Sequence, residues 1–226
     1  MSVSIGFQRK MNEWISSNNN GVAFRPFLVD GNPYKSRVFV VGAFPHPKLE
    51  VSGEFQQFEY MEALVDATLF ELIYGEQMQS RENKGIAAFM HWLKEECGER
   101  AVNTTITALM AESAKHLKEY SKVLSEDYEK GYDVFGQVLA EFQPKVLILH
   151  GADALRQFRQ RFADSLIDHY AHIEKVQDLE DVGAFAELFV TNERKIKVFA
   201  CRSLSYYGKT GEVFTLFKNE VRRILS

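Results

Sequence analysis

The fold of this chain is decided by Arg37-Val-Phe-Val-Val-Gly-Ala-Phe-Pro-His-Pro47, a stretch near the start of its 226 residues. Residues 38–41 are β-branched or aromatic without a break, which predicts a strand buried on both faces in a parallel sheet. Gly42 ends that strand, and two prolines stiffen the loop that follows. Because ligand crevices in open α/β sheets lie beyond the carboxyl ends of the strands, we expect the functional site at residues 42–47.

Three later segments also predict strands, because each is rich in β-branched or other apolar residues: 101–107, 145–150 and 196–201. Segments with apolar residues at helical spacing surround them, and 164–189 is interpreted as helical as well. In the last predicted helix, the residues expected to face inward are Val213, Leu216, Phe217, Val221 and Ile224. This alternation predicts an α/β fold, a three-layer α/β/α sandwich with a mainly parallel four-stranded central sheet. No linker or repeat divides the chain, so we expect residues 1–226 to form one domain.

The composition narrows the class of protein. Hydrophobic residues make up 46% and charged residues 26% of the chain, which are ordinary values for a globular domain. There is no run of eighteen apolar residues and no signal-peptide pattern, so we expect no membrane partner and a cytoplasmic location. Cys97 and Cys201 lack metal-ligand spacing and are expected to be reduced thiols. The net charge of −4 argues mildly against tight duplex binding, although a local basic patch would permit it.

Four junctions follow one another along the chain: Gly42-Ala-Phe-Pro45, Gln143-Pro-Lys145, Gly151-Ala-Asp-Ala154 and Ala200-Cys-Arg-Ser-Leu-Ser-Tyr-Tyr-Gly208. In this order they resemble the uracil-DNA glycosylase superfamily, over roughly residues 22–225. The resemblance implies that family's fold and a crevice for a flipped nucleobase, which an aromatic ring stacks on and an amide reads. It also implies DNA, a nucleobase or a nucleotide as partner, and hydrolysis of an N-glycosidic bond in DNA repair as the reaction.

Two departures from the family's pattern leave the enzymatic activity open. The family has a polar, water-handling residue in the first loop, where this chain has Ala43 and Phe44. It has His-Pro-Ser in the last loop, where this chain has Arg202-Ser203-Leu204. Bond cleavage needs a group that handles water and a donor for the leaving base, but Phe44 cannot titrate and Arg202 cannot cycle a proton. The resemblance therefore carries over the fold and the crevice, with Phe44 as a stacking platform.

Two histidines are candidates for acid–base chemistry at the carboxyl ends of the predicted strands. His46 lies between two prolines, and His150 ends the third strand. Each has a structural alternative, as a surface loop residue and as a strand-end residue. Asn103 or Thr105, on one face of the second strand, would read a base edge or be satisfied by local hydrogen bonds.

The loop after the last strand offers donors for a phosphate from Arg202, Ser203, Ser205 and Tyr206, or is simply a solvated loop. The candidate ligand-binding residues are therefore Gly42, Phe44, His46, Asn103, Arg202, Ser203, Ser205 and Tyr206. His169 and His172 are three apart, but no third ligand is near them in sequence, so we expect no metal site. No cofactor motif such as a P-loop is present, so no cofactor is expected.

Three functions remain compatible with these residues. The first is a divergent uracil-DNA glycosylase-like protein that binds a nucleobase or nucleic acid in the crevice. The second is a scaffold with a protein partner, for which an exposed apolar patch at 55–74 would be the sign. The third is a small-molecule α/β hydrolase that uses His46 or His150 as its base.

Overall fold

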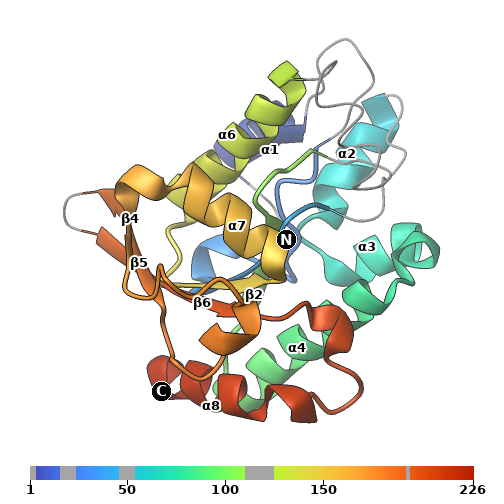
Figure 1. Cartoon of the computed structure of the whole chain (residues 1–226). Coiled ribbons are helices and arrows are strands. Elements are labelled where there is room, and N and C mark those ends of the chain that lie inside the picture. The colour runs from blue at the N-terminus through green and yellow to red at the C-terminus, as the bar shows by residue number, and fades with distance from the viewer. Residues whose placement is uncertain (1–3, 16–23, 46–53, 110–124, 192–193) are drawn as a thin grey trace.

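The computed structural model describes residues 4–15, 24–45, 54–109, 125–191 and 194–226. Within these ranges the chain folds into one mixed sheet with helices on both of its faces (Figure 1). The predicted α/β class is therefore confirmed.

The sheet has six strands, which lie in the order β2-β1-β3-β6-β5-β4. The strands are β1 (Val38–Gly42), β2 (Ala101–Thr105), β3 (Val146–His150), β4 (Leu166–Asp168), β5 (Ala186–Thr191) and β6 (Arg194–Cys201). Strands β2, β1, β3 and β6 are parallel and correspond to the four predicted strands. Strands β5 and β4 are antiparallel, so the prediction of a four-stranded sheet was wrong in the number of strands.

The two missed strands lie in the segment that was interpreted as helical. Ala186 and Leu188 are buried, whereas Glu187 between them bonds to Lys195 on the neighbouring strand. This alternation has the period of two that belongs to a strand. Just before it, Gly183 has a φ of +81°, a conformation that ends any helix and that glycine adopts without strain. Pairing with β6 therefore decides the structure of this segment.

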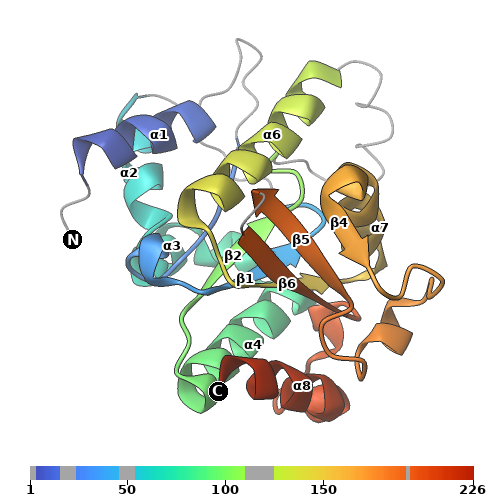
Figure 2. The same cartoon turned by 90° about the vertical axis from the view of Figure 1, so that its left-hand side faces the viewer.

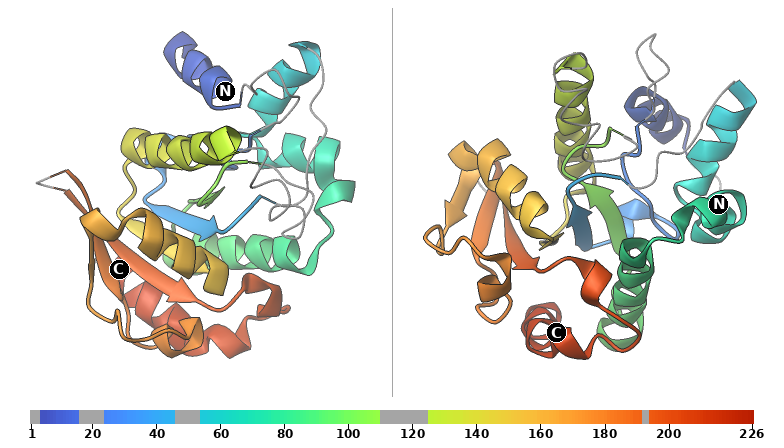
Figure 3. Two further views of the ribbon diagram at one scale, coloured as in Figure 1. Left: turned by 45° about the horizontal axis from the view of Figure 1, so that its top comes forward. Right: turned by 45° about the vertical axis from the view of Figure 1, so that its right-hand side comes forward.

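The helices are α1 (Ile5–Ile15), α2 (Glu54–Ala63), α3 (Ala67–Tyr74), α4 (Arg81–Cys97), α6 (Ser125–Phe142), α7 (Ala152–Arg161) and α8 (Thr215–Leu225). Alternate residues of β1 face opposite layers. Val38 and Val40 contribute to the core formed with α4 and α8, and Phe39 and Val41 to the core formed with α1, α6 and α7. Figures 2 and 3 show α4 and α8 together on one side of the sheet and α6 on the other.

Helix α4 is the element that positions the site described below. Its first turn is capped by the Ser80 hydroxyl, which accepts a hydrogen bond from the Asn83 N–H at 3.1 Å. Gly98 ends it in a left-handed conformation with φ +67°, as expected for the residue after a helix. Near its start, Gly85 packs against the Leu204 carbonyl so closely that a Cβ there would lie 1.8 Å from the oxygen. The helix is therefore held tightly against the loop that follows β6.

The C-terminal helix starts later than predicted, and this changes which residues face inward. Phe217 and Val221 are buried as expected, but Val213 and Leu216 are exposed. A 3-10 turn at Glu212–Phe214 comes before α8 and directs Phe214 into the core in place of Val213. The single helical stripe assumed from the sequence is therefore wrong at these two positions. None of the helices in the described ranges is long and apolar enough to span a bilayer.

Candidate functional site

The carboxyl ends of the parallel strands bring Gly42, Thr105 and His150 together. Gly42 is in register with Thr105 on β2, and a Cβ at Gly42 would lie 3.0 Å from Nε2 of His150. The same Cβ would lie 3.4 Å from Cγ2 of Thr105. The Thr105 hydroxyl donates a hydrogen bond to the Thr107 carbonyl at 2.8 Å, which is the local satisfaction considered for it above. Gly42 is therefore a packing position beneath the imidazole.

The imidazole of His150 is enclosed, with a side-chain exposure of 1%. Nδ1 lies 3.4 Å from Oε1 of Glu82, at the far end of hydrogen-bond range, and neither ring nitrogen is hydrogen-bonded to a described residue. Burial lowers the pKa of His150 to about 4 because the charged ring loses its hydration. At neutral pH the ring is therefore uncharged, and both of its nitrogens are shielded from solvent.

A buried arginine that sequence reasoning missed belongs to the same region. Arg25 is 4% exposed, and burial lowers its pKa, opposed by the charge of Glu82. Its Nη1 lies 3.9 Å from Sδ of Met78, whose sulfur also accepts from the Asn83 amide at 3.4 Å. Arg25 precedes Pro26 in an irregular segment, where no spacing signal marks a residue as buried. The Glu82 carboxylate thus interacts electrostatically with the buried Arg25 guanidinium and lies 3.4 Å from the buried His150 imidazole.

Arg202 forms a paired contact with Glu180. Its Nε and Nη2 donate to the carboxylate at 2.8 and 2.7 Å, and its backbone N–H donates to Oε1 at 2.7 Å. The hydrogen bond to Glu180 raises the pKa of Arg202. Glu180 is 6% exposed, so this is a partly buried, bidentate ion pair. The guanidinium predicted to bind phosphate is therefore already engaged by a carboxylate.

The other predicted ligand-binding residues do not form a common site. The Ser203 hydroxyl accepts from the Ser205 N–H at 3.2 Å and so caps the turn at Leu204–Tyr206. The two serine hydroxyls are 2.9 Å apart, and Tyr206 is exposed to solvent. Phe44 is half-buried. His46 lies outside the described residues.

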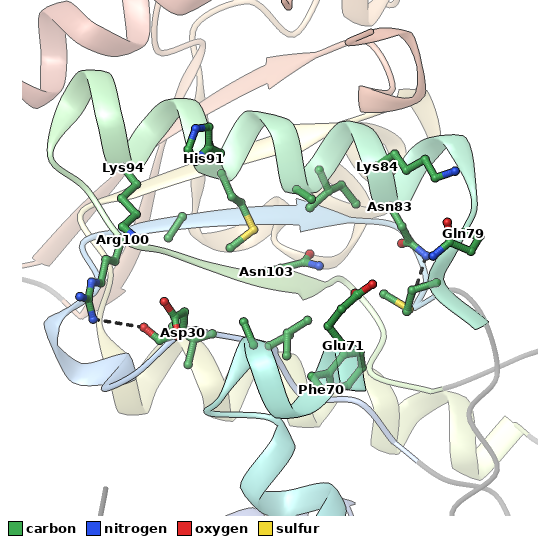
Figure 4. Close-up of a pocket in the computed structure, with 18 residues that line it drawn as sticks. Asp30, Phe70, Glu71, Gln79, Asn83, Lys84, His91, Lys94, Arg100 and Asn103 are labelled. Carbon is green, nitrogen blue, oxygen red and sulfur yellow. Dashed lines mark hydrogen bonds between the residues drawn. The ribbon is translucent and has the colours of Figure 1, made fainter. Parts of the chain in front are cut away.

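A cavity of about 530 Å³ opens between α3 and α4, beside the edge strand β2 (Figure 4). Its walls include Phe70 of α3 and Ile86 and Met90 of α4, and its size is typical of a small-molecule site. Figure 4 labels amide and charged side chains around these apolar walls. Asn103 is labelled in the middle of the cavity, on its β2 side.

Asn103 is the predicted site residue that lines this cavity. It is 5% exposed, and its backbone N–H and carbonyl exchange hydrogen bonds with Leu28 at 2.9 and 2.7 Å. Its carboxamide makes no hydrogen bond within the described part of the chain. The side chain therefore presents a donor and an acceptor toward the cavity while the backbone holds the strand in place.

The sequence-predicted residues do not converge on one pocket. Phe44, His150 and Arg202 are absent from the cavity lining, and Asn103 alone of the candidate set belongs to it among the described residues. The cavity is formed largely by α3, α4 and residues 28–30, which sequence reasoning treated as framework. Met90 of α4 has the helical spacing of a core residue, but it is only half-buried and lies beside the cavity, so the sequence pattern does not mark the cavity.

Two other predicted features can be located. His169 and His172 are both exposed, and the described residues contain no group of three or more His, Cys, Asp or Glu placed to hold a metal. In the 55–74 segment Phe58 and Leu72 are exposed, but Tyr60, Phe70 and Tyr74 are buried. The apolar residues of that segment therefore serve mainly as core.

The chain matches no model of a known protein family, and no curated protein sequence matches it. The uracil-DNA glycosylase resemblance accordingly stays a prediction from the four sequence junctions.

Proposed function

We propose that the protein binds a ligand that contains a nucleobase, in the cavity between α3 and α4. The proposal rests on one observation, the carboxamide of Asn103, which is buried beside that cavity and makes no hydrogen bond within the described chain. This amide lines the cavity and has no partner from the described protein, so it is available to a ligand. A ligand edge with a matching acceptor and donor would gain hydrogen bonds that each contribute about 0.5–1.5 kcal/mol.

A flat heteroaromatic ring suits both the amide and the walls. The Asn103 carboxamide offers one N–H₂ donor group and one carbonyl acceptor, the pair that an amide uses to read a base edge. Phe70, Ile86 and Met90 supply apolar contacts for the faces of such a ring, and Met adapts readily to an irregular ligand. A purely aliphatic ligand would leave the amide unpaired.

The proposal is for binding and does not include cleavage of a glycosidic bond. Ala43 and Phe44 follow β1 and carry no group that positions or activates water. His150 is uncharged and enclosed. None of these three residues lines the cavity.

Calorimetric titration of the purified protein with the four common ribonucleosides tests this proposal. At least one nucleoside is expected to bind saturably, and Asn103→Ala is expected to weaken that binding about tenfold, since an unpaired ligand edge costs at least ~1.4 kcal/mol. The variant keeps both backbone hydrogen bonds to Leu28, so its fold is expected to persist. Asn103→Asp, which keeps the shape and loses the amide donor, is expected to weaken binding as well.

Asn219→Ala is the matched control, because Asn219 is an exposed residue of α8 outside the cavity lining. It should bind nucleosides as tightly as the wild type. Failure of all four nucleosides to bind, or equal affinity in Asn103→Ala and wild type, would overturn the proposal.

A further inference from the structure

We propose that the ligand is a free nucleoside monophosphate, whose phosphate is held at one end of the cavity by Lys94 and Arg100. This inference rests on the proposed nucleobase binding and adds the chemical class of the ligand. It also separates a free nucleotide from a base that belongs to a nucleic-acid strand.

The cavity is more basic than the chain as a whole. Its charged lining residues are Lys84, Lys94 and Arg100 on the positive side and Asp30 and Glu71 on the negative side. That is an excess of one positive charge on a chain whose net charge is −4. The positive charges are not spread evenly along the cavity. Lys94 and Arg100 lie next to each other at one end, with His91 one turn away on α4 (Figure 4).

Both cations at this end are available to bind an anion. Within the described part of the chain, neither Lys94 nor Arg100 takes part in an ion pair. Arg100 donates one hydrogen bond, from Nη1 to the backbone carbonyl of Asp30 at 3.4 Å. A guanidinium has five N–H donors in a rigid fork, so this contact orients it and leaves Nε and Nη2 for a bidentate partner. Phosphate oxygens fit that fork, and Lys94 adds a second positive charge.

One acidic side chain at this end disfavours a bound phosphate. Asp30 lines the same end, and its carboxylate would repel a phosphate. Lys94 and Arg100 outnumber it, so the net charge of the three side chains at this end is positive. The same carboxylate can accept a hydrogen bond from a ribose hydroxyl, which would separate the base at Asn103 from the phosphate at Arg100.

The position of Asn103 favours a free nucleotide over a strand. Asn103 lies in the middle of β2, in register with Val40, and not beyond the carboxyl ends of the strands. Leu28 forms an antiparallel bridge with it on the outer edge of the strand. A nucleotide within a strand continues in both directions, and at the other end of the cavity it would meet both Glu71 and Lys84, whose charges cancel (Figure 4). A free monophosphate carries its charge at one end, and the excess positive charge of the cavity also lies at one end.

Competitive calorimetry at low salt tests the inference with nucleosides, their 5′-monophosphates and a short mixed-sequence single strand of DNA. The monophosphate of the preferred nucleoside is expected to bind about tenfold more tightly than the nucleoside, because charge-assisted bonds to a phosphate are the stronger kind. Added salt should reduce that gain, since screening weakens exposed ionic contacts. The single strand is expected to bind more weakly than the monophosphate.

The double variant Lys94→Met/Arg100→Gln should remove the gain from the phosphate and leave the affinity for the nucleoside within about twofold. The control variant Arg9→Gln/Lys209→Met also removes one arginine and one lysine charge, but from exposed sites outside the cavity lining. It should keep the gain in affinity from the phosphate. Equal affinity for nucleoside and monophosphate, a gain that survives in Lys94→Met/Arg100→Gln, or tighter binding of the single strand would overturn this inference while nucleobase binding stands. If no nucleoside and no monophosphate binds, both proposals fall.

Discussion

The imidazole of His150 occupies the space that a side chain at Gly42 would need. A Cβ at position 42 would lie 3.0 Å from Nε2 and 3.2 Å from Cε1 of His150. Both residues end their strands on the face of the sheet that α4 covers, so neither can retreat toward solvent. Glycine is therefore required at the end of β1 for a reason of packing, and its φ is not positive.

Gly42→Ala is expected to destabilise the protein by about 1–3 kcal/mol, because adding a methyl group to a packed interior forces its neighbours to shift. Urea denaturation of wild type and variant at pH 7.5 measures the difference. Pairing the change with His150→Ser, which removes the ring, should recover much of the loss. If Gly42→Ala costs the same with and without the His150 ring, the steric account of this pair is wrong.

A second packing contact holds α4 against the loop after β6. Because a Cβ at Gly85 would lie 1.8 Å from the Leu204 carbonyl oxygen, Gly85→Ala must displace backbone and is expected to cost about 3 kcal/mol or more. Gly136 in α6 is the matched control, since nothing lies within 4 Å of a Cβ there. Gly136→Ala should instead stabilise the protein by roughly 0.5–1 kcal/mol, the ordinary helix preference for alanine. Thermal denaturation of both variants gives the comparison, and equal shifts would contradict it.

The parallel strands could be predicted because their signal is local. The unbroken apolar runs at Val38–Gly42 and Val146–His150 have few alternatives to a strand buried on both faces. Strand β5 could not be predicted in this way, since its pattern of Ala186, Glu187 and Leu188 is short and ambiguous. Pairing with β6, which comes later in the chain, decides it.

The cavity could not be predicted from the sequence either, because it depends on how elements that are distant in sequence pack together. Its volume depends on the distance between α3 and α4, and no residue type encodes that distance. Asn103 was identified from its place on a strand, but the prediction assumed that the site lies beyond the strand ends. Arg202 was chosen for its charge, and the carboxylate that engages it, Glu180, lies 22 residues away in a turn that was interpreted as helix.

The Arg202–Glu180 pair leads to a prediction about stability and one about binding. Arg202→Gln should destabilise the protein by about 1–3 kcal/mol, because it leaves the buried carboxylate of Glu180 with fewer donors. Adding Glu180→Gln should recover part of this loss, since an uncharged amide tolerates burial better. Chemical denaturation of the single and double variants measures both effects.

The same Arg202→Gln variant should bind nucleosides and monophosphates as tightly as the wild type, because Arg202 does not line the cavity. A loss of ligand affinity without a loss of stability would contradict the structural role given to Arg202. It would favour the phosphate contact expected from the sequence.

His150 is expected to make the stability of the protein depend on pH. Burial lowers its pKa from 6.5 to about 4. As the pH falls, the His150 imidazole therefore becomes protonated near pH 6.5 in the unfolded chain but only near pH 4 in the folded chain. Stability from the neutral ring is complete above pH 6.5 and is lost as the pH falls toward 4, by roughly 3 kcal/mol at ~1.4 kcal/mol per pKa unit. Urea denaturation of wild type and His150→Leu from pH 7.5 to 4.5 tests this, since the imidazole is the one titratable group in which the two proteins differ. The wild type should lose more stability than the variant, and parallel curves would mean that the His150 pKa is not lowered.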